Sequence, residues 1–220
     1  MKKVYSLLAG LVLATGMMVN PAVQAKGQAG VFDYYLLTLS WSPTFCLTHT
    51  TDQQCTKGYG FVLHGLWPQY TNGGWPQYTN GGWPQDCPPI TTLTAQERKY
   101  GNTLFPTDTL LTHEWSKHGT CSGLGANGYL QAADNALTKV KIPASFQAPT
   151  KPLQLTAQQI LDAFHQSNPG LAQGSIVAVC SGPELSEIRV CMDKDLNAQS
   201  CGKAVKTQCR DGNIRVPNVR

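Results

Sequence analysis

The nine residues 113–121 carry the side chains of this sequence that are best suited to acid–base chemistry. They read His-Glu-Trp-Ser-Lys-His-Gly-Thr-Cys, in a chain of which only 14% of the residues are charged. In a helix, which turns about 100° per residue, the titratable side chains share one face: His113, Glu114, Lys117 and His118. Such a face can exchange protons and stabilise a developing anion. A solvated polar stripe is the simpler interpretation of an arbitrary helix.

A zinc site is the main alternative for two histidines around a glutamate. In the His-Glu-x-x-His motif the histidines are four residues apart, so both imidazoles point the same way. His113 and His118 are five residues apart, and their directions on a helix differ by about 140°. That is poor geometry for chelating one ion, whereas acid–base catalysis tolerates it. We expect no metal here.

A third histidine, His64, lies in the segment Phe-Val-Leu-His-Gly-Leu-Trp-Pro at 61–68. A lone histidine on a predicted strand is usually a structural residue. Here Gly65 leaves room for a close approach, and Trp67 offers a face on which a base could stack. We therefore expect His64 to belong to the same site.

The first 25 residues have the features of a signal peptide. The chain begins Met-Lys-Lys, continues with an apolar stretch over 7–19 that is too short to span a membrane, and reaches Val-Gln-Ala at 23–25. We expect a signal peptide over 1–25 and one mature domain over 26–220, with no membrane association after cleavage. A bacterial periplasm is the expected location, and secretion is the alternative.

Charge and cysteine content limit the class of protein. The formal net charge falls from +4 to +2 when the signal leaves, because it contains two lysines and no acidic residue. This mild charge favours a polyanion bound at a local site over one coated by protein. The eight cysteines, all after residue 25, predict disulfides in an exported chain. Spacing alone leaves 105 possible pairings.

The order of predicted elements indicates an α+β fold in a single domain, with an antiparallel β-sheet core packed against several helices. Alternation predicts strands over 31–41 and 58–66, and apolar runs predict strands over 175–180 and 187–192. Predicted helices cover 107–119, 128–140 and 156–167, and Thr94 with Glu97 forms a capping-box signal for a further short helix.

An eight-residue unit, Trp-Pro-Gln-Tyr-Thr-Asn-Gly-Gly, occupies 67–74 and recurs unchanged at 75–82. Two copies are too few and too short for a solenoid. A tandem duplication in a surface loop is the plain interpretation, because lengthening a loop costs little entropy. A selected function for the added aromatic turn is the alternative.

The two histidine segments, 64–68 and 113–121, together resemble the active-site segments of the ribonuclease T2 family. Residues 39–46, Leu-Ser-Trp-Ser-Pro-Thr-Phe-Cys, resemble the first strand and first cysteine of that family. The resemblance spans nearly the whole mature chain. It implies a disulfide-stabilised α+β fold and an endoribonuclease that cleaves single-stranded RNA through 2′,3′-cyclic phosphates, with no metal or other cofactor.

The resemblance also implies a role for each catalytic residue. His118 would be the general base and His64 the general acid, His113 would bind the phosphate, and Lys117 and Glu114 would stabilise the transition state. Histidine can serve as acid or base near neutral pH. The pair implies a bell-shaped pH profile, with the acid optimum that the family tends to show.

Substrate-binding residues and partners are expected as follows. Trp67 is the first stacking residue for a base, and Tyr70 or its copy Tyr78 is a second aromatic wall. Gln69 stands where some fungal members have an aspartate, so we expect low base specificity. RNA is the expected partner, with no activity on DNA, and the chain is expected to be a monomer.

The family pattern further implies four disulfides: Cys46–Cys55, Cys87–Cys121, Cys180–Cys209 and Cys191–Cys201. Two other functions compete with this prediction. A non-catalytic RNA binder would keep its function without His64 and His118, and a metal-dependent phosphoesterase would lose activity in EDTA.

Overall fold

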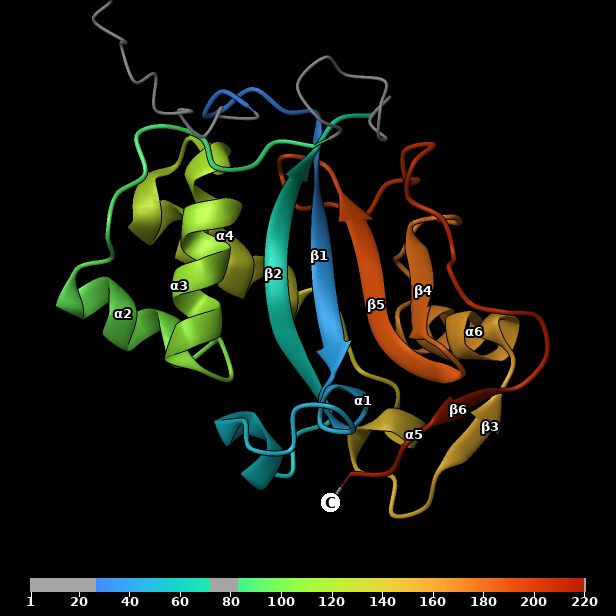
Figure 1. Ribbon diagram of the computed structural model, residues 1–220. Coiled ribbons are helices and arrows are strands. Elements are labelled where there is room, and N and C mark those ends of the chain that lie inside the picture. Colours follow the sequence, from blue (N-terminus) through green and yellow to red (C-terminus); the bar gives the residue numbers. More distant parts are fainter. Residues whose placement is uncertain (1–26, 72–82, 220) are drawn as a thin grey trace, which may run out of the picture.

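A six-stranded sheet forms the centre of the computed structural model, which describes residues 27–71 and 83–219 (Figure 1). The strands follow the order β2-β1-β5-β6-β3, and β4 pairs with β5. Their bounds are β1 Tyr34–Trp41, β2 Phe61–Gln69, β3 Leu153–Leu155, β4 Ile176–Ser181, β5 Glu184–Met192 and β6 Ile214–Val216. The strands pair antiparallel except for one parallel contact between β5 and β6.

Helices flank the sheet on either side. Figure 1 shows α2, α3 and α4 grouped next to β2, and α6 next to β4. The helices are α1 Ser42–Phe45, α2 Ala95–Gly101, α3 Asp108–Lys117, α4 Gly125–Thr138, α5 Ala144–Gln147 and α6 Ala157–Ser167, with 3₁₀ turns η1 Gln53–Thr56 and η2 Gly119–Ser122. No helix in these described ranges is long and apolar enough to cross a membrane.

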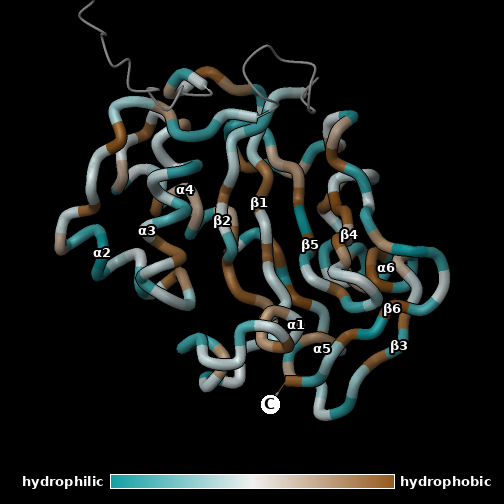
Figure 2. The backbone as a smooth tube through the Cα atoms, viewed as in Figure 1, coloured by the Kyte–Doolittle hydropathy of each residue, from teal (hydrophilic) through white to brown (hydrophobic). Residues whose placement is uncertain are grey.

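The central strand β1 is buried on both faces. Alternate side chains, including Leu37 and Leu39, belong to the main core, whereas Tyr34 and Leu36 pack with Cys191 in a smaller cluster on the opposite face. β4, an apolar strand on the other side of β5, is coloured hydrophobic over most of its length in Figure 2. Full burial of a leucine such as Leu37 or Leu39 on β1 contributes about 1.5–3 kcal/mol relative to an exposed side chain. The sheet therefore forms a rigid base for whatever side chains it presents.

Helix α3 has a well-defined start. The Thr107 side chain accepts a hydrogen bond from the backbone N–H of Leu110, which satisfies one of the free donors at the helix terminus. Asp108 in the first turn and Lys117 in the last turn both complement the helix dipole. These contacts fix the start of the helix that carries the predicted acid–base residues, and they stabilise it.

Strand β2 contains a bulge at His64. On β1, Thr38 pairs with Gly65 but the next residue, Leu39, pairs with Leu63, so His64 is the extra residue on β2. A bulge of this kind bends the strand and redirects its side chains, and bulges occur often beside active sites. The irregularity therefore coincides with one of the two predicted histidine segments.

The predicted α+β single-domain fold is confirmed, and so is the capping box at Thr94; Thr156 and Gln159 form a second capping box at the start of α6. The predicted helix 107–119 is shorter in the structure, because the chain tightens into η2 after α3, and the helix predicted from 128 begins three residues earlier, at Gly125. The short strands β3 and β6 were not predicted. The predicted signal peptide and the repeat copy at 75–82, including Tyr78, lie outside the described residues.

Four disulfides connect all eight cysteines: Cys46–Cys55, Cys87–Cys121, Cys180–Cys209 and Cys191–Cys201. These are the pairs that the family resemblance implies. Cys87–Cys121 joins the segment before α2 to the η2 turn that directly follows α3, and both of its cysteines are fully buried.

Replacing both Cys87 and Cys121 with alanine should lower the free energy of unfolding by about 3–4 kcal/mol, because the bond closes a long loop in the unfolded chain. The melting temperature should fall by on the order of 10 °C in thermal unfolding followed by circular dichroism. The matched control removes Cys46 and Cys55, whose sequence separation is 9 rather than 34. A larger loss in the control would contradict the expected ranking.

Candidate active site

His64 lies between two carboxylates that come from different elements. Its Nδ1 is 2.9 Å from Oε1 of Glu187 on β5, and its Nε2 is 3.5 Å from Oε1 of Glu114 on α3. The Glu114 side chain is 1% exposed and that of His64 is 29% exposed. The imidazole is thus fixed from two sides while part of it stays open to solvent.

Trp67 connects the two histidine segments. Its indole Nε1 donates a hydrogen bond of 2.6 Å to Oε2 of Glu114. Its ring centroid is 5.1 Å from that of His64, edge to face, and 5.0 Å from that of His118, in a stacked arrangement. Two imidazoles from segments far apart in the sequence therefore contact one indole.

Gly65 makes this contact possible. A Cβ atom at this position would collide with Oε2 of Glu114 and Nε1 of Trp67, which are the two atoms of the hydrogen bond described above. The absence of a side chain at Gly65 allows the carboxylate of the helix to reach the indole of the strand. The close approach expected at Gly65 is therefore the approach of Glu114 to Trp67.

His118 is buried at the C-terminal end of α3. The residue is only 7% exposed, and its backbone N–H donates to the carbonyl of Glu114 at 3.0 Å. Its Nδ1 has no hydrogen-bond partner among the described residues. Burial, and then the positive charges of Lys117, His113 and His64, lower the pKa of His118 to about 3. The imidazole is therefore neutral at physiological pH.

The pKa of His64 moves in the opposite direction. Burial alone would lower it, but the hydrogen bond to Glu187 and the charges of Glu114 and Glu187 outweigh burial and raise the pKa. Burial raises the pKa of Glu114 to about 7, against the opposing effects of His64 and of the hydrogen bond from Trp67. The site thus holds one histidine that favours the protonated form and one that favours the neutral form.

The remaining predicted residues lie at the rim. His113 is exposed, and Lys117, with a side chain 36% exposed, has its Nζ 3.8 Å from Oδ2 of Asp86. The Asp86 backbone N–H also donates to the carbonyl of Lys117 at 2.8 Å. Tyr70 follows β2 directly and is half-buried. The structure therefore brings His64, Glu114 and His118 into one contact network and leaves the two cationic groups beside it.

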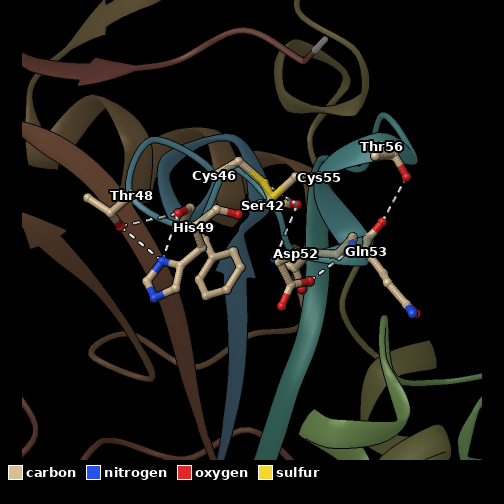
Figure 3. The surroundings of a disulfide bond; sticks show 10 residues. Ser42, Cys46, Thr48, His49, Asp52, Gln53, Cys55 and Thr56 are labelled. Atoms are coloured by element: carbon tan, nitrogen blue, oxygen red, sulfur yellow. Dashed lines mark hydrogen bonds between the residues drawn. A yellow bond between two sulfur atoms is a disulfide. The ribbon is translucent and has the colours of Figure 1, made fainter.

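A cavity of about 300 Å³ opens between the two segments, and both His64 and His113 line it. Its other lining residues are Ser40, Phe45, Asp52, Gln54, Val62, Thr107, Thr109 and Leu110. Asp52 and Gln54 come from the loop that Cys46–Cys55 closes (Figure 3). The Phe45 ring stacks on His49 at a centroid distance of 4.0 Å. Part of the cavity wall thus belongs to a loop that a disulfide closes.

Three residues that support these side chains were not predicted from the sequence: Glu187 beside His64, Asp86 beside Lys117, and Arg189, which donates a hydrogen bond to Glu187. Glu187 and Arg189 lie in a strand predicted from its apolar residues, and Glu187 is only 8% exposed. Two charges within a buried strand were the available signal, because buried charges are rare unless paired. Within the described ranges, no three His, Cys, Asp or Glu side chains are grouped so that they could hold a metal ion.

Solved structures of ribonucleases share this fold. RNase NT in complex with 5′-AMP aligns with a TM-score of 0.64 and 24% identity over 85% of this chain and 98% of that chain. An RNase-related protein from Calystegia sepium aligns with a TM-score of 0.64 and 23% identity over 86% and 97%. The likeness shows that this chain has the same α+β fold as these proteins.

The sequence comparisons identify the family. The sequence model of the Ribonuclease T2 family matches residues 32–201, and the chain belongs to this family. A ribonuclease of Aeromonas hydrophila is 36% identical in an alignment of 222 positions, gaps included, that covers 92% of this chain and 96% of the relative. Ribonuclease DdI of Dictyostelium discoideum is 26% identical, with 94% and 98% covered.

Replacing Gly65 with alanine should separate Glu114 from Trp67 and displace His64. We expect the rate of RNA cleavage to fall at least about 100-fold, because a misplacement of about 1 Å can cause a loss of this size. A fluorogenic RNA substrate measures the rate. Gly170→Ala is the control, because a Cβ there meets nothing within 4 Å. Full activity of the Gly65 variant would show that this approach has no catalytic importance.

Proposed function

We propose that this T2-type endoribonuclease cleaves single-stranded RNA without a metal ion, with His118 as general base and His64 as general acid. The observation that carries the proposal is the contact of both imidazoles with the Trp67 indole, in surroundings that favour opposite protonation states. A two-histidine mechanism needs one neutral and one protonated imidazole at the same pH.

The reaction then proceeds in two steps. Neutral His118 takes the proton of the 2′-hydroxyl, and the 2′-oxygen attacks phosphorus, which is held close by the RNA chain itself. The bond from phosphorus to the 5′-oxygen breaks as protonated His64 donates its proton to that oxygen. The product is a 2′,3′-cyclic phosphate, which water opens with the two histidines in reversed roles.

Cationic groups beside the imidazoles support charge stabilisation. Lys117 and His113 both act electrostatically on His118, so they lie near the phosphorane that would form there. A fixed ammonium near developing negative charge stabilises the transition state. Glu114, buried and hydrogen-bonded to Trp67, holds the indole and faces the Nε2 atom of His64.

The cavity beside His64 and His113 suits one nucleobase, and we propose low base specificity. Apolar side chains such as Leu110 and Val62 line it together with short polar ones. Nucleotide binding by proteins of the same fold supports binding of RNA: one solved structure is RNase NT in complex with 5′-AMP, and another is an RNase MC1 mutant in complex with 5′-UMP. Trp67 and Tyr70 remain proposed stacking residues for RNA outside this cavity, because neither of them lines it.

Location and partners follow from the same reasoning. We propose that residues 1–25 are removed as a signal peptide and that 26–220 acts as a monomer in the periplasm or outside the cell. An oxidising compartment suits a chain whose eight cysteines all form disulfides. DNA should not be cleaved, because it lacks the 2′-hydroxyl that serves as nucleophile.

Digestion of polyuridylate in EDTA tests the mechanism. His64→Ala and His118→Ala should each lower kcat by about 10²- to 10⁴-fold, the usual contribution of a general acid or base. Products of the parent protein should end in 2′,3′-cyclic phosphates. His165→Ala, on α6 and away from the site, is the matched control. Loss of activity in EDTA, or full activity of either site variant, would contradict the proposal.

The pH profile tests the assignment of acid and base. The raised pKa of His64 keeps it protonated at acid pH, and the acid function is lost as pH rises through that pKa. The base is available above the lowered pKa of His118, about 3. We expect kcat/KM for a dinucleoside monophosphate to be highest below neutrality and to fall at alkaline pH. A rate that keeps rising to alkaline pH would exclude this assignment.

A further inference from the structure

Glu187 and Arg189 lie on β5, two strands away from His64. On β1, Thr38 pairs both with Arg189 and with Gly65, the residue that follows His64. Gly65 and Arg189 therefore lie on either side of Thr38 in the sheet, next to the bulge at His64. The His64 side chain reaches across β1 to contact Glu187.

The two carboxylate oxygens of Glu187 have separate partners. Oε1 lies 2.9 Å from Nδ1 of His64. Oε2 accepts from Nε of Arg189 at 2.8 Å and lies 2.6 Å from its second guanidinium nitrogen. This forked contact fixes the direction of the carboxylate, because the guanidinium is planar and its donors are rigid. The oxygen that faces His64 is thus directed at the imidazole.

Arg189 is itself held by the site. Its guanidinium carbon lies 5.3 Å from the centroid of the Trp67 ring, a cation–π distance. The contacts therefore close into a ring that runs through Trp67, Glu114, His64, Glu187 and Arg189. Every member of this ring has two neighbours, so no side chain in it can turn without breaking a contact.

We infer that Glu187 is a positioning residue for the general acid, fixing the tautomer and orientation of His64, and that Arg189 holds Glu187 in place. The inference rests on the proposed role of His64. Glu187 accepts the Nδ1–H, and the proton that leaves for the 5′-oxygen comes from Nε2. Nδ1 keeps its proton throughout, so the neutral imidazole left behind is a single tautomer.

The charges around His64 give this role a measurable signature. Glu187 and Glu114 stabilise the imidazolium, whereas the positive charge of Arg189 disfavours it. Loss of the Glu187 charge and loss of the Arg189 charge should therefore shift the pKa of His64 in opposite directions. Each shift follows from the charge that is lost, so the positioning role itself is tested by the kinetics of Glu187→Gln.

The experiment compares Glu187→Gln and Arg189→Gln by NMR titration of the His64 imidazole in the substrate-free protein, with the resonance assigned from a His64→Gln variant. Glu187→Gln should lower the pKa of His64, and Arg189→Gln should raise it. Glu184→Gln is the matched control, because Glu184 lies on the same strand and faces Arg215 at 3.6 Å. It should leave the titration unchanged.

Kinetics supplies the second readout. Glu187→Gln should lower kcat by about 10- to 100-fold near neutral pH, with KM nearly unchanged, and should move the alkaline limb of kcat/KM to lower pH. The deficit should shrink at acid pH, where His64 is protonated in both proteins.

An unmoved His64 titration in both variants, shifts of the same sign, or an unchanged kcat in Glu187→Gln would overturn the inference. If one variant fails to fold in thermal unfolding, the direction of the shift in the other decides. Opposite shifts in a protein that does not cleave RNA would leave the positioning contact standing and remove the proposed function instead.

Discussion

The burial of one carboxyl group, that of Glu114, is the constraint on which the site depends. Its side chain is 1% exposed, and a buried carboxyl group is costly unless its oxygens are paired. The partners, Trp67 and His64, are supplied by β2, so the helix and the strand can pack closely only in the register that brings these groups together. Gly65 supplies the space for this approach. Stability and geometry of the site are therefore two results of the same contact.

This arrangement also produces the electrostatic difference between the two histidines. His64 lies among carboxylates from both neighbouring elements, whereas His118 lies among positive groups and is shielded from water. The two pKa values move apart because burial dominates at His118, whereas the hydrogen bond and the charges of the neighbouring carboxylates outweigh burial at His64. Pairs of titratable groups pushed apart in this way are typical of sites that use one acid and one base.

The sequence predicts part of this site because part of it depends on local spacing. The segment 113–121 carries its own order of side chains, and the glycine after His64 marks a close approach without any knowledge of the fold. The bulge at His64 and the contact with Glu187 depend on the pairing of β2, β1 and β5, and register between distant strands is not encoded in any one segment. Residues 187–192 read as a buried strand, and only the partners of Glu187 and Arg189 reveal why two charges are tolerated there.

The end of α3 shows how the same limit applies to the cationic side of the site. Lys117 is the last residue of the helix, where side chains usually move freely, yet Asp86 binds both its backbone carbonyl and its ammonium group. Asp86 has a positive φ of 54°, a conformation that aspartate adopts more readily than most residues. The next residue, Cys87, is bonded to Cys121 just beyond the helix. The Cys87–Cys121 bond and the turn at Asp86 thus hold Lys117 beside the buried imidazole of His118. A non-glycine residue keeps a positive φ only where its surroundings determine that conformation.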